Sequence, residues 1–282
     1  MKLLLKPAFL VLMTGIVFTG FNSCKKSNTP AAVSADTQAA EDNAYAEGTY
    51  SDAYNAVDVA VRSNGTTGYF KTAQATLDML SGTSITLTFD TVPYGKTLTI
   101  DFGTGTTCRD GRTRSGQIIA TWNGRYRDSA SLVSINFNNY TVNGDKVTGT
   151  KTVTNLGHNA KGNLHFSIVV TNASITTSSG TISWQSTRDR EWVAGESTLD
   201  WTDDVYNITG SASGTNRKGQ TFTITIVKPI VVALNCHWIE SGSFDISTSA
   251  SNSTGTVDYG PGTCDDQATF TYNGKSYDFT LR

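Results

Sequence analysis

The chain has 282 residues, a formal net charge of −2 at pH 7 and only 16% charged residues. This balance leaves no basic surface for nucleic acid, so we expect no nucleic-acid partner. The scarcity of charge also argues against a coiled coil and an acidic disordered tail, so Thr, Ser, Asn and Gly must supply most of the polar surface.

Residues 1–23 have the pattern of a lipoprotein signal peptide. Lys2 and Lys6 precede an apolar run from 7 to 21, which is the order of charge and hydrophobicity in such signals. The run is shorter than the roughly 18 to 20 residues of a membrane-spanning helix. It ends at Ser23-Cys24, which is similar to a lipobox, where a small residue precedes the cysteine that receives the lipid.

We therefore expect acylated Cys24 to hold the mature protein on the lipid bilayer, because several acyl chains make membrane attachment persistent. This reading places the protein in the cell envelope, on the outer membrane in preference to the inner one, facing the periplasm or the cell surface. An ordinary cleaved signal and an uncleaved anchor are the alternatives.

Residues 24–40 are predicted to form the lipidated cysteine and a flexible tether, because small polar residues there show no apolar period. A helical segment is predicted for residues 41–80, with Asp42 as its N-cap and Asn64-Gly65 as a stop signal. The apolar residues that recur at helical spacing are Tyr50, Ala53, Tyr54, Val57 and Val61.

From residue 81 to 282 apolar residues alternate with Thr and Ser, the period of strands with one buried and one solvated face. Hairpin turns are predicted at Asn123-Gly124, Asn143-Gly144 and Asn273-Gly274, since a type I′ turn needs positive φ at both positions. The fold class is therefore all-β: a large antiparallel meander, barrel-like or a sandwich, preceded by a short N-terminal helical segment. The alternating apolar positions include Leu98, Ile100, Val133, Ile135, Leu164, Phe166, Ile182, Trp184, Phe222, Ile224, Tyr277 and Phe279.

Residues 97–125 and 254–275 resemble each other, which suggests a pseudo-symmetric pair of hairpins. In both, an Asp precedes a Gly-rich turn and a cysteine follows it. The simpler interpretation is that the glycines allow the strand to turn. The alternative is a cation site formed by the nearby carboxylates, but their spacing does not match a regular calcium loop, and we expect no metal. These carboxylates belong to Asp101, Asp110, Asp258, Asp265 and Asp266.

Several motifs occur together along the mature chain. They are the Ser-Cys-Lys lipobox, the stretch from Asp101 to Gly105 followed by 110–116, the segments 142–144 and 149–155, Glu191-Trp192 with Gly195, the segment 208–211, and Cys264-Asp265. In this combination the chain resembles a set of uncharacterised all-β lipoproteins from Bacteroidota. The resemblance covers most of the mature chain and implies the compartment and the all-β architecture, but that family brings no assigned chemistry to named residues.

Sequence motifs of catalysis are missing. His158, His165 and His237 lie apart from one another, without the spacing of a zinc site. Neither a Gly-X-Ser-X-Gly elbow nor a phosphate-binding Gly-rich loop occurs. We expect no cofactor.

A carboxylate pair is the remaining route to catalysis, since a glycosidase needs only two Asp or Glu residues about 5 to 9 Å apart. Glu191 and Glu196 lie close in sequence to Trp192 and Trp201, whose indoles could face a carbohydrate or another envelope component. The competing interpretation is that both tryptophans belong to the core or its rim. Two functions therefore stay open: a non-catalytic binding, adhesion or scaffolding module, and a carbohydrate-active or other hydrolytic lipoprotein.

Three cysteines remain once Cys24 carries the lipid, and an exported protein can form disulfides. We favour a disulfide between Cys236 and Cys264, because the intervening strands can return the chain to within bridging distance. The competing pair is Cys108 with Cys264, which would join the two similar turns directly.

Overall fold

The computed structural model describes residues 31–63, 80, 86–92, 95–125, 127–198, 200–236, 238–251 and 254–280, and for residues 31–35, 62, 63, 86–92, 95 and 201 it describes the backbone alone. One helix, α1 (Ala31–Ser63), precedes the strands, and a 3-10 turn, η2 (Trp201–Asp203), interrupts them. The strands are β1 (Thr86–Val92), β2 (Gly95–Asp101), β3 (Thr106–Thr107), β4 (Thr113–Trp122), β5 (Leu132–Val142), β6 (Asp145–His158), β7 (Leu164–Thr177), β8 (Gly180–Ala194), β9 (Val205–Thr215), β10 (Thr221–Ala233), β11 (Ser241–Thr248), β12 (Gly255–Pro261), β13 (Gln267–Tyr272) and β14 (Lys275–Thr280).

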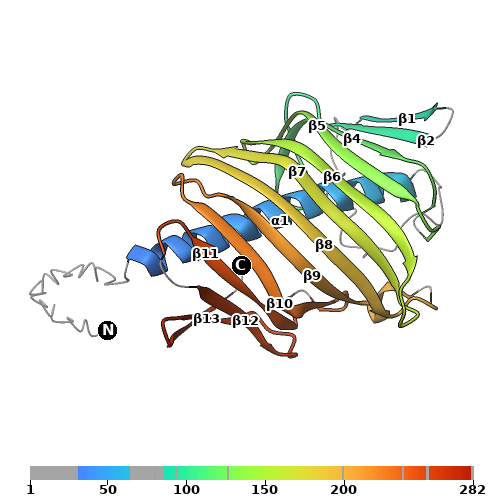
Figure 1. The fold of residues 1–282 in the computed structure, drawn as a ribbon. Coiled ribbons are helices and arrows are strands. Elements are labelled where there is room, and N and C mark those ends of the chain that lie inside the picture. The colour runs from blue at the N-terminus through green and yellow to red at the C-terminus, as the bar shows by residue number, and fades with distance from the viewer. Residues whose placement is uncertain are drawn as a thin grey trace, which may run out of the picture.

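The strands form one antiparallel sheet in which nearly every strand pairs with its neighbours in sequence. The order runs from β1 through β2 and β4 to β14, and the short β3 pairs with β4 beside this path. The predicted antiparallel meander is confirmed. Among the described residues, β1 and β14 do not pair with each other, so the sheet is not closed into a barrel and remains a single curved layer (Figure 1).

Glycine bulges bend the long central strands. Gly116 and Gly149 both have positive φ and lie where the strand register shifts. A Cβ on Gly116 would lie 2.2 Å from the carbonyl oxygen of Asn139, and one on Gly149 would lie 2.7 Å from the Cα of Ala173. Bulges increase the local bend and twist of a strand, so these positions contribute to the curvature of the sheet.

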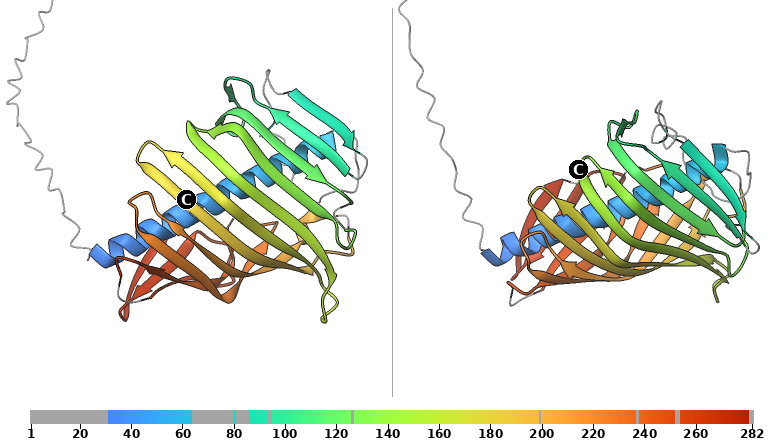
Figure 2. Two further views of the ribbon diagram at one scale, coloured as in Figure 1. Left: turned by 45° about the horizontal axis from the view of Figure 1, so that its top comes forward. Right: turned by 90° about the horizontal axis from the view of Figure 1, so that it is seen from above.

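Helix α1 lies along the concave face of this curved sheet (Figure 2). It contacts β2, β4, β8 and β11, so it crosses the strands from one side of the sheet to the other. Tyr50 packs on Trp184 with 5.6 Å between ring centroids and on Phe137 with 5.7 Å. The helix and the inward side chains of the strands form one hydrophobic core, and burial of this apolar surface is the main favourable contribution to folding.

Acidic residues of α1 meet basic or hydroxyl side chains of the sheet in regular order along the helix. Carboxylates so placed fix both the direction and the register of α1 against the strands. From the N-terminal end, Asp36 accepts a hydrogen bond from Thr248 (2.8 Å), Asp42 pairs with Arg217, Glu47 with Arg188 (3.1 Å), and Asp52 with Arg114 (2.8 Å).

The helix begins earlier than the sequence predicted. Its first residue is Ala31, so residues 31–40 are helical and the prediction of a flexible tether is wrong for them. Asp36 and Ala39 are buried, and Asp42 lies within the helix and is not its N-cap. The reason is tertiary: small residues without an apolar period become helical where the sheet covers them. The helix ends at Ser63, directly before the predicted stop, and residues 64–79 of the predicted helical segment lie outside the described residues.

Two of the three predicted hairpin turns are confirmed. Asn143-Gly144 and Asn273-Gly274 have positive φ at both residues and join β5 to β6 and β13 to β14. The prediction for Asn123-Gly124 is wrong, because β4 ends at Trp122 and β5 begins only at Leu132. There the Asn123 side chain accepts a hydrogen bond from the Leu132 backbone N–H at 2.8 Å, so the asparagine caps a longer loop.

The predicted strand faces agree with the observed burial except at the edge. Leu98, Ile135 and Phe166 are fully buried, and their sequence neighbours face outward. Tyr277 and Phe279 lie on the terminal strand β14 and stay exposed, since no described strand covers its outer side.

Candidate functional site

The loops that follow β4, β6 and β8 meet around a pocket at one end of the sheet. Its volume is about 420 Å³, and it is lined by Arg127, Asn163 and residues 192–197. We call it the loop-end pocket. Two of the predicted ligand-facing residues, Trp192 and Glu196, are part of its wall.

Trp192 cannot act as a sugar platform. Its side chain is only 1% exposed, and its ring packs against Tyr206 with 5.5 Å between centroids. The guanidinium of Arg127 covers the ring at 4.8 Å from its centroid. The expectation that this indole faces a ligand is therefore corrected: Trp192 belongs to the core and supports a cation that no sequence motif had indicated.

The carboxylate of Glu191 is bound by side chains of the β6–β7 turn. Its Oε1 accepts hydrogen bonds from the side-chain amides of Asn159 (2.7 Å) and Asn163 (2.9 Å), and its Oε2 pairs with Lys161 Nζ at 3.2 Å. These hydrogen bonds, with that from Asn159 first, hold the pKa of the Glu191 carboxyl below its usual range. A glycosidase acid needs a raised pKa, so Glu191 is placed to order the β6–β7 turn and not to donate a proton.

Glu196 and Asp189 each pair with a histidine. Glu196 Oε1 lies 2.9 Å from Nε2 of His158, and Asp189 Oδ2 lies 2.8 Å from Nδ1 of His165. His165 is opposite Glu191 in the β7–β8 register, while His158 ends β6. In the sequence these histidines are isolated residues, and the antiparallel pairing brings each one to a carboxylate.

The other predicted aromatic, Trp201, lies in η2, and its side chain is outside the described residues. Around it, Thr198 Oγ1 donates to the carboxylate of Asp203 at 2.9 Å, and Asp204 is fully buried. Both carboxylates therefore belong to the β8–β9 connection, in which Asp203 is part of η2.

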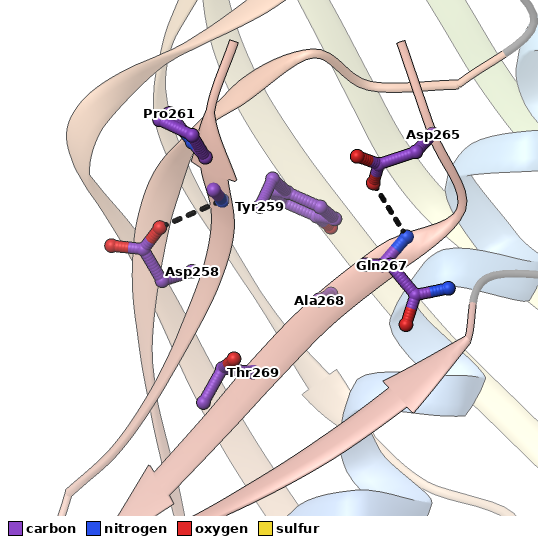
Figure 3. Close-up of a pocket in the computed structure, with 8 residues that line it drawn as sticks. Asp258, Tyr259, Pro261, Asp265, Gln267, Ala268 and Thr269 are labelled. Carbon is purple, nitrogen blue, oxygen red and sulfur yellow. Dashed lines mark hydrogen bonds between the residues drawn. The ribbon is translucent and has the colours of Figure 1, made fainter. Parts of the chain in front are cut away.

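A second pocket, of about 330 Å³, lies where β12 and β13 diverge (Figure 3). The backbone N–H of Gly260 donates to Asp258 at 2.8 Å, and that of Gln267 donates to Asp265 at 2.9 Å. Burial alone would raise the pKa of Asp258, but the hydrogen bonds from Gly260 and Lys228 outweigh it and lower that pKa. The carboxylates at this pocket thus stabilise the turn itself.

The two similar sequence segments share this turn geometry. Asp101 accepts a hydrogen bond from the Gly103 N–H at 2.8 Å, as Asp258 does from Gly260. Asp110 is held by Arg114 at 2.7 Å. Within the described ranges, no group of three or more His, Cys, Asp or Glu side chains is placed to hold a metal ion.

Cys236 and Cys264 form a disulfide with a Cα–Cα distance of 5.7 Å, which is the pairing favoured on sequence grounds. Cys108 is a buried free thiol. The bond joins the loop after β10 to the turn between β12 and β13, beside the second pocket. Cys24 lies outside the described residues, so its lipidation remains a prediction.

Lys151 is a charged residue in a buried environment. It is 7% exposed and lies on the concave face, with Nζ 5.5 Å from the centroid of the Tyr54 ring. Burial, reinforced by the charge of Arg190, lowers the pKa of Lys151 to about 7, and Glu47 opposes the shift. The alternation of this strand does indicate the burial, since Lys151 and the buried Val153 are two residues apart and face the same side of the sheet.

Comparisons of the chain with models of protein families, with curated proteins and with solved structures found no match. In the part of the chain that the structure describes, no helix has the length and apolar character needed to cross a bilayer.

Proposed function

We propose that the protein is a lipid-anchored lipoprotein of the cell envelope that acts as a non-catalytic binding, adhesion or scaffolding module. Acylated Cys24 would attach it to the membrane, with the outer membrane as the preferred location. Helix α1 begins at Ala31, seven residues after this cysteine, so the folded domain would lie close to the bilayer.

The observation that carries the non-catalytic role is the filled concave face. A curved sheet of this size could enclose a ligand cavity, but α1 occupies the concavity with buried side chains such as Tyr50 and Val57. The carboxylates predicted for catalysis are engaged by neighbouring side chains, Glu191 by two amides and Glu196 by His158. Among the described residues, the surface available to a partner therefore includes the loop ends and the convex face.

The convex face supports a surface role. Cross-strand neighbours form one row that crosses the sheet from β1 to β14, and its members are Ser or Thr apart from Val169, Asp245 and Asp90. The row runs through Asp90, Thr97, Thr121, Ser134, Thr152, Val169, Thr187, Ser211, Thr225, Asp245, Thr256, Thr271 and Ser276.

Hydrogen bonds within this face keep its hydroxyls ordered, as between Thr256 and Asp245 (2.6 Å) and between Thr271 and Ser276 (3.0 Å). An ordered surface composed mainly of uncharged hydroxyls suits contact with other polar envelope components.

The test is membrane partitioning of wild type and Cys24→Ala in a Gram-negative host, with labelling by a radioactive fatty acid. Wild type should carry label and enter the detergent phase, because the lipid supplies the persistent membrane contact. Cys24→Ala should carry no label and remain in the aqueous phase or unprocessed. Ser27→Ala, in the same segment, is the matched control and should behave as wild type. Equal detergent partitioning of Cys24→Ala would refute the lipid anchor.

The hydrolytic alternative has its own measurement. Release of nitrophenol from a panel of nitrophenyl glycosides should not exceed the rate without protein. Hydrolysis by wild type that is lost in both Glu191→Gln and Glu196→Gln would establish the alternative and end the non-catalytic proposal.

A further inference from the structure

Arg127 has an unusual setting in the loop-end pocket. Arg127 is an exposed residue, yet its guanidinium carbon lies over the buried ring of Trp192, 4.8 Å from the ring centroid. Stacking on an indole fixes the plane of a guanidinium while leaving its N–H groups free to bind a ligand. Because Trp192 is itself fixed by Tyr206, the cation is held in position before any ligand arrives.

No described carboxylate forms an ion pair with Arg127. Glu191 is bound by Asn159, Asn163 and Lys161, and Glu196 is bound by His158. The contrast with Arg125, two residues earlier in the same loop, is direct, since Arg125 Nε lies 3.2 Å from the Asp128 carboxylate. Among the residues that the structure describes, Arg127 is therefore the cation lining this pocket that has no carboxylate partner.

We propose that the loop-end pocket binds the carboxylate of an acidic sugar, with Arg127 as the residue that recognises it. A planar guanidinium can bind a carboxylate through two parallel hydrogen bonds, which supplies both affinity and orientation. The remaining wall suits a hydroxyl-rich ligand, because its polar residues include Ser197, Asn163 and Glu196, the last of which pairs with His158. This inference rests on the proposed binding role and gives it a ligand class.

The experiment compares two probes with the same sugar chain, trigalacturonate with charged carboxylates and its uncharged, fully methyl-esterified form. Both are titrated calorimetrically into the purified full chain in non-ionic detergent at low salt. The acid should bind, and the ester should bind at least about tenfold more weakly, since hydrogen bonds between two charged groups are roughly twice as strong as those between neutral groups. Added NaCl should weaken binding of the acid.

Three variants assign the effect to one residue. Arg127→Met keeps an apolar stem over Trp192 but loses the guanidinium, and should weaken acid binding at least about tenfold. Arg127→Lys keeps the charge without the planar pair of donors. Its affinity for the acid should therefore fall between that of wild type and that of Arg127→Met. Arg125→Met is the matched control and should bind as wild type. Thermal melts of each variant check that the fold is retained.

Equal affinity for acid and ester, absence of acid binding, or an Arg127→Met variant that binds as wild type would each overturn the inference. Tighter binding of a free acidic tripeptide than of trigalacturonate would overturn the sugar assignment. None of these outcomes alters the partitioning of Cys24→Ala, so failure here is distinguishable from failure of the lipid-anchor proposal.

Discussion

Asp42 of α1 and Arg217 of the β9–β10 turn are separated by 175 positions in sequence and joined by two hydrogen bonds in the fold. The Arg217 backbone N–H donates to Oδ2 of Asp42 at 2.8 Å, and its Nε donates to Oδ1 at 2.7 Å. Asp42 is fully buried. This contact fixes the N-terminal half of the helix against the sheet.

Asp42→Ala should lower the free energy of unfolding by about 2–3 kcal/mol, because it leaves a partly buried guanidinium and a backbone N–H without their acceptor. Urea unfolding followed by circular dichroism measures the change. Glu41→Ala is the matched control: Glu41 is the exposed neighbour on the same helix, and its removal should change stability by less than about 0.5 kcal/mol. Equal effects of the two substitutions would show that the contact does not hold the helix.

Lys151→Met should stabilise the protein by about 1–4 kcal/mol near pH 6–7, because it removes a buried charge. The folded pKa of Lys151, about 7, lies below its ordinary value of 10.5. Below pH 7 the lysine is charged in both states, and the full cost of burying it applies. Between pH 7 and 10.5 this lysine holds more protons in the unfolded chain than in the folded one. Raising the pH through this window therefore increases the stability of wild type, and the cost of burying the charge is progressively lost.

The advantage of Lys151→Met should therefore shrink from pH 7 towards pH 10. Denaturant unfolding at several pH values tests this, with Lys146→Met as control, since Lys146 lies on the same strand and is exposed. A constant difference between Lys151→Met and wild type across the range would contradict the shifted pKa.

The Cys236–Cys264 disulfide should stabilise the native protein by about 3–4 kcal/mol, as expected from loop closure over a separation of 28 residues. Cys236→Ser should lose this amount relative to oxidised wild type, and reduced wild type should lose the same. Non-reducing peptide mapping should find the two cysteines in one linked peptide, which Cys108→Ala should leave unchanged. A linked peptide that contains Cys108 would contradict the pairing.

Gly149→Ala should destabilise the protein by about 2–4 kcal/mol, since the new Cβ would meet the neighbouring strand at 2.7 Å and φ is +114°. Gly144→Ala is the matched comparison. Gly144 also has positive φ, but a Cβ added there would have no atom within 4 Å among the described residues, so strain alone should cost about 1 kcal/mol. Thermal unfolding of both variants provides the measurement, and equal losses would show that the close strand approach is unimportant.

Local patterns in the sequence were sufficient for the strands and for some of their turns. A strand exposes alternate residues to opposite faces, so the parity of Ile100, Ile135 and Ile224 identifies the buried face without knowledge of the neighbours. Asn143-Gly144 specifies a tight turn because its own backbone preferences suffice. Asn123-Gly124 does not form such a turn, since the partner strand begins only at Leu132 and the asparagine side chain caps the longer loop.

The candidate site was predicted only in its location. Glu191, Trp192 and Glu196 do lie together near the loop-end pocket, but burial of Trp192 and the amides around Glu191 exclude the roles expected of them. Arg127 carries no sequence motif, and its role depends on a ring that lies 65 positions later in the chain.

The sequence by itself determined the alternation of the strands and the antiparallel connections, because these depend on residue parity and turn conformation. Only the tertiary structure decided between the two cysteine pairings in favour of Cys236 with Cys264. It also decided that the sheet stays open and wraps α1, that residues 31–40 are helical, and that Lys151 is buried. Those features depend on bulges that curve distant strands together and on acid–base pairs across the whole chain, such as Asp42 with Arg217. Neither is encoded within a local window of residues, since each exists only once the strands have assembled around the helix.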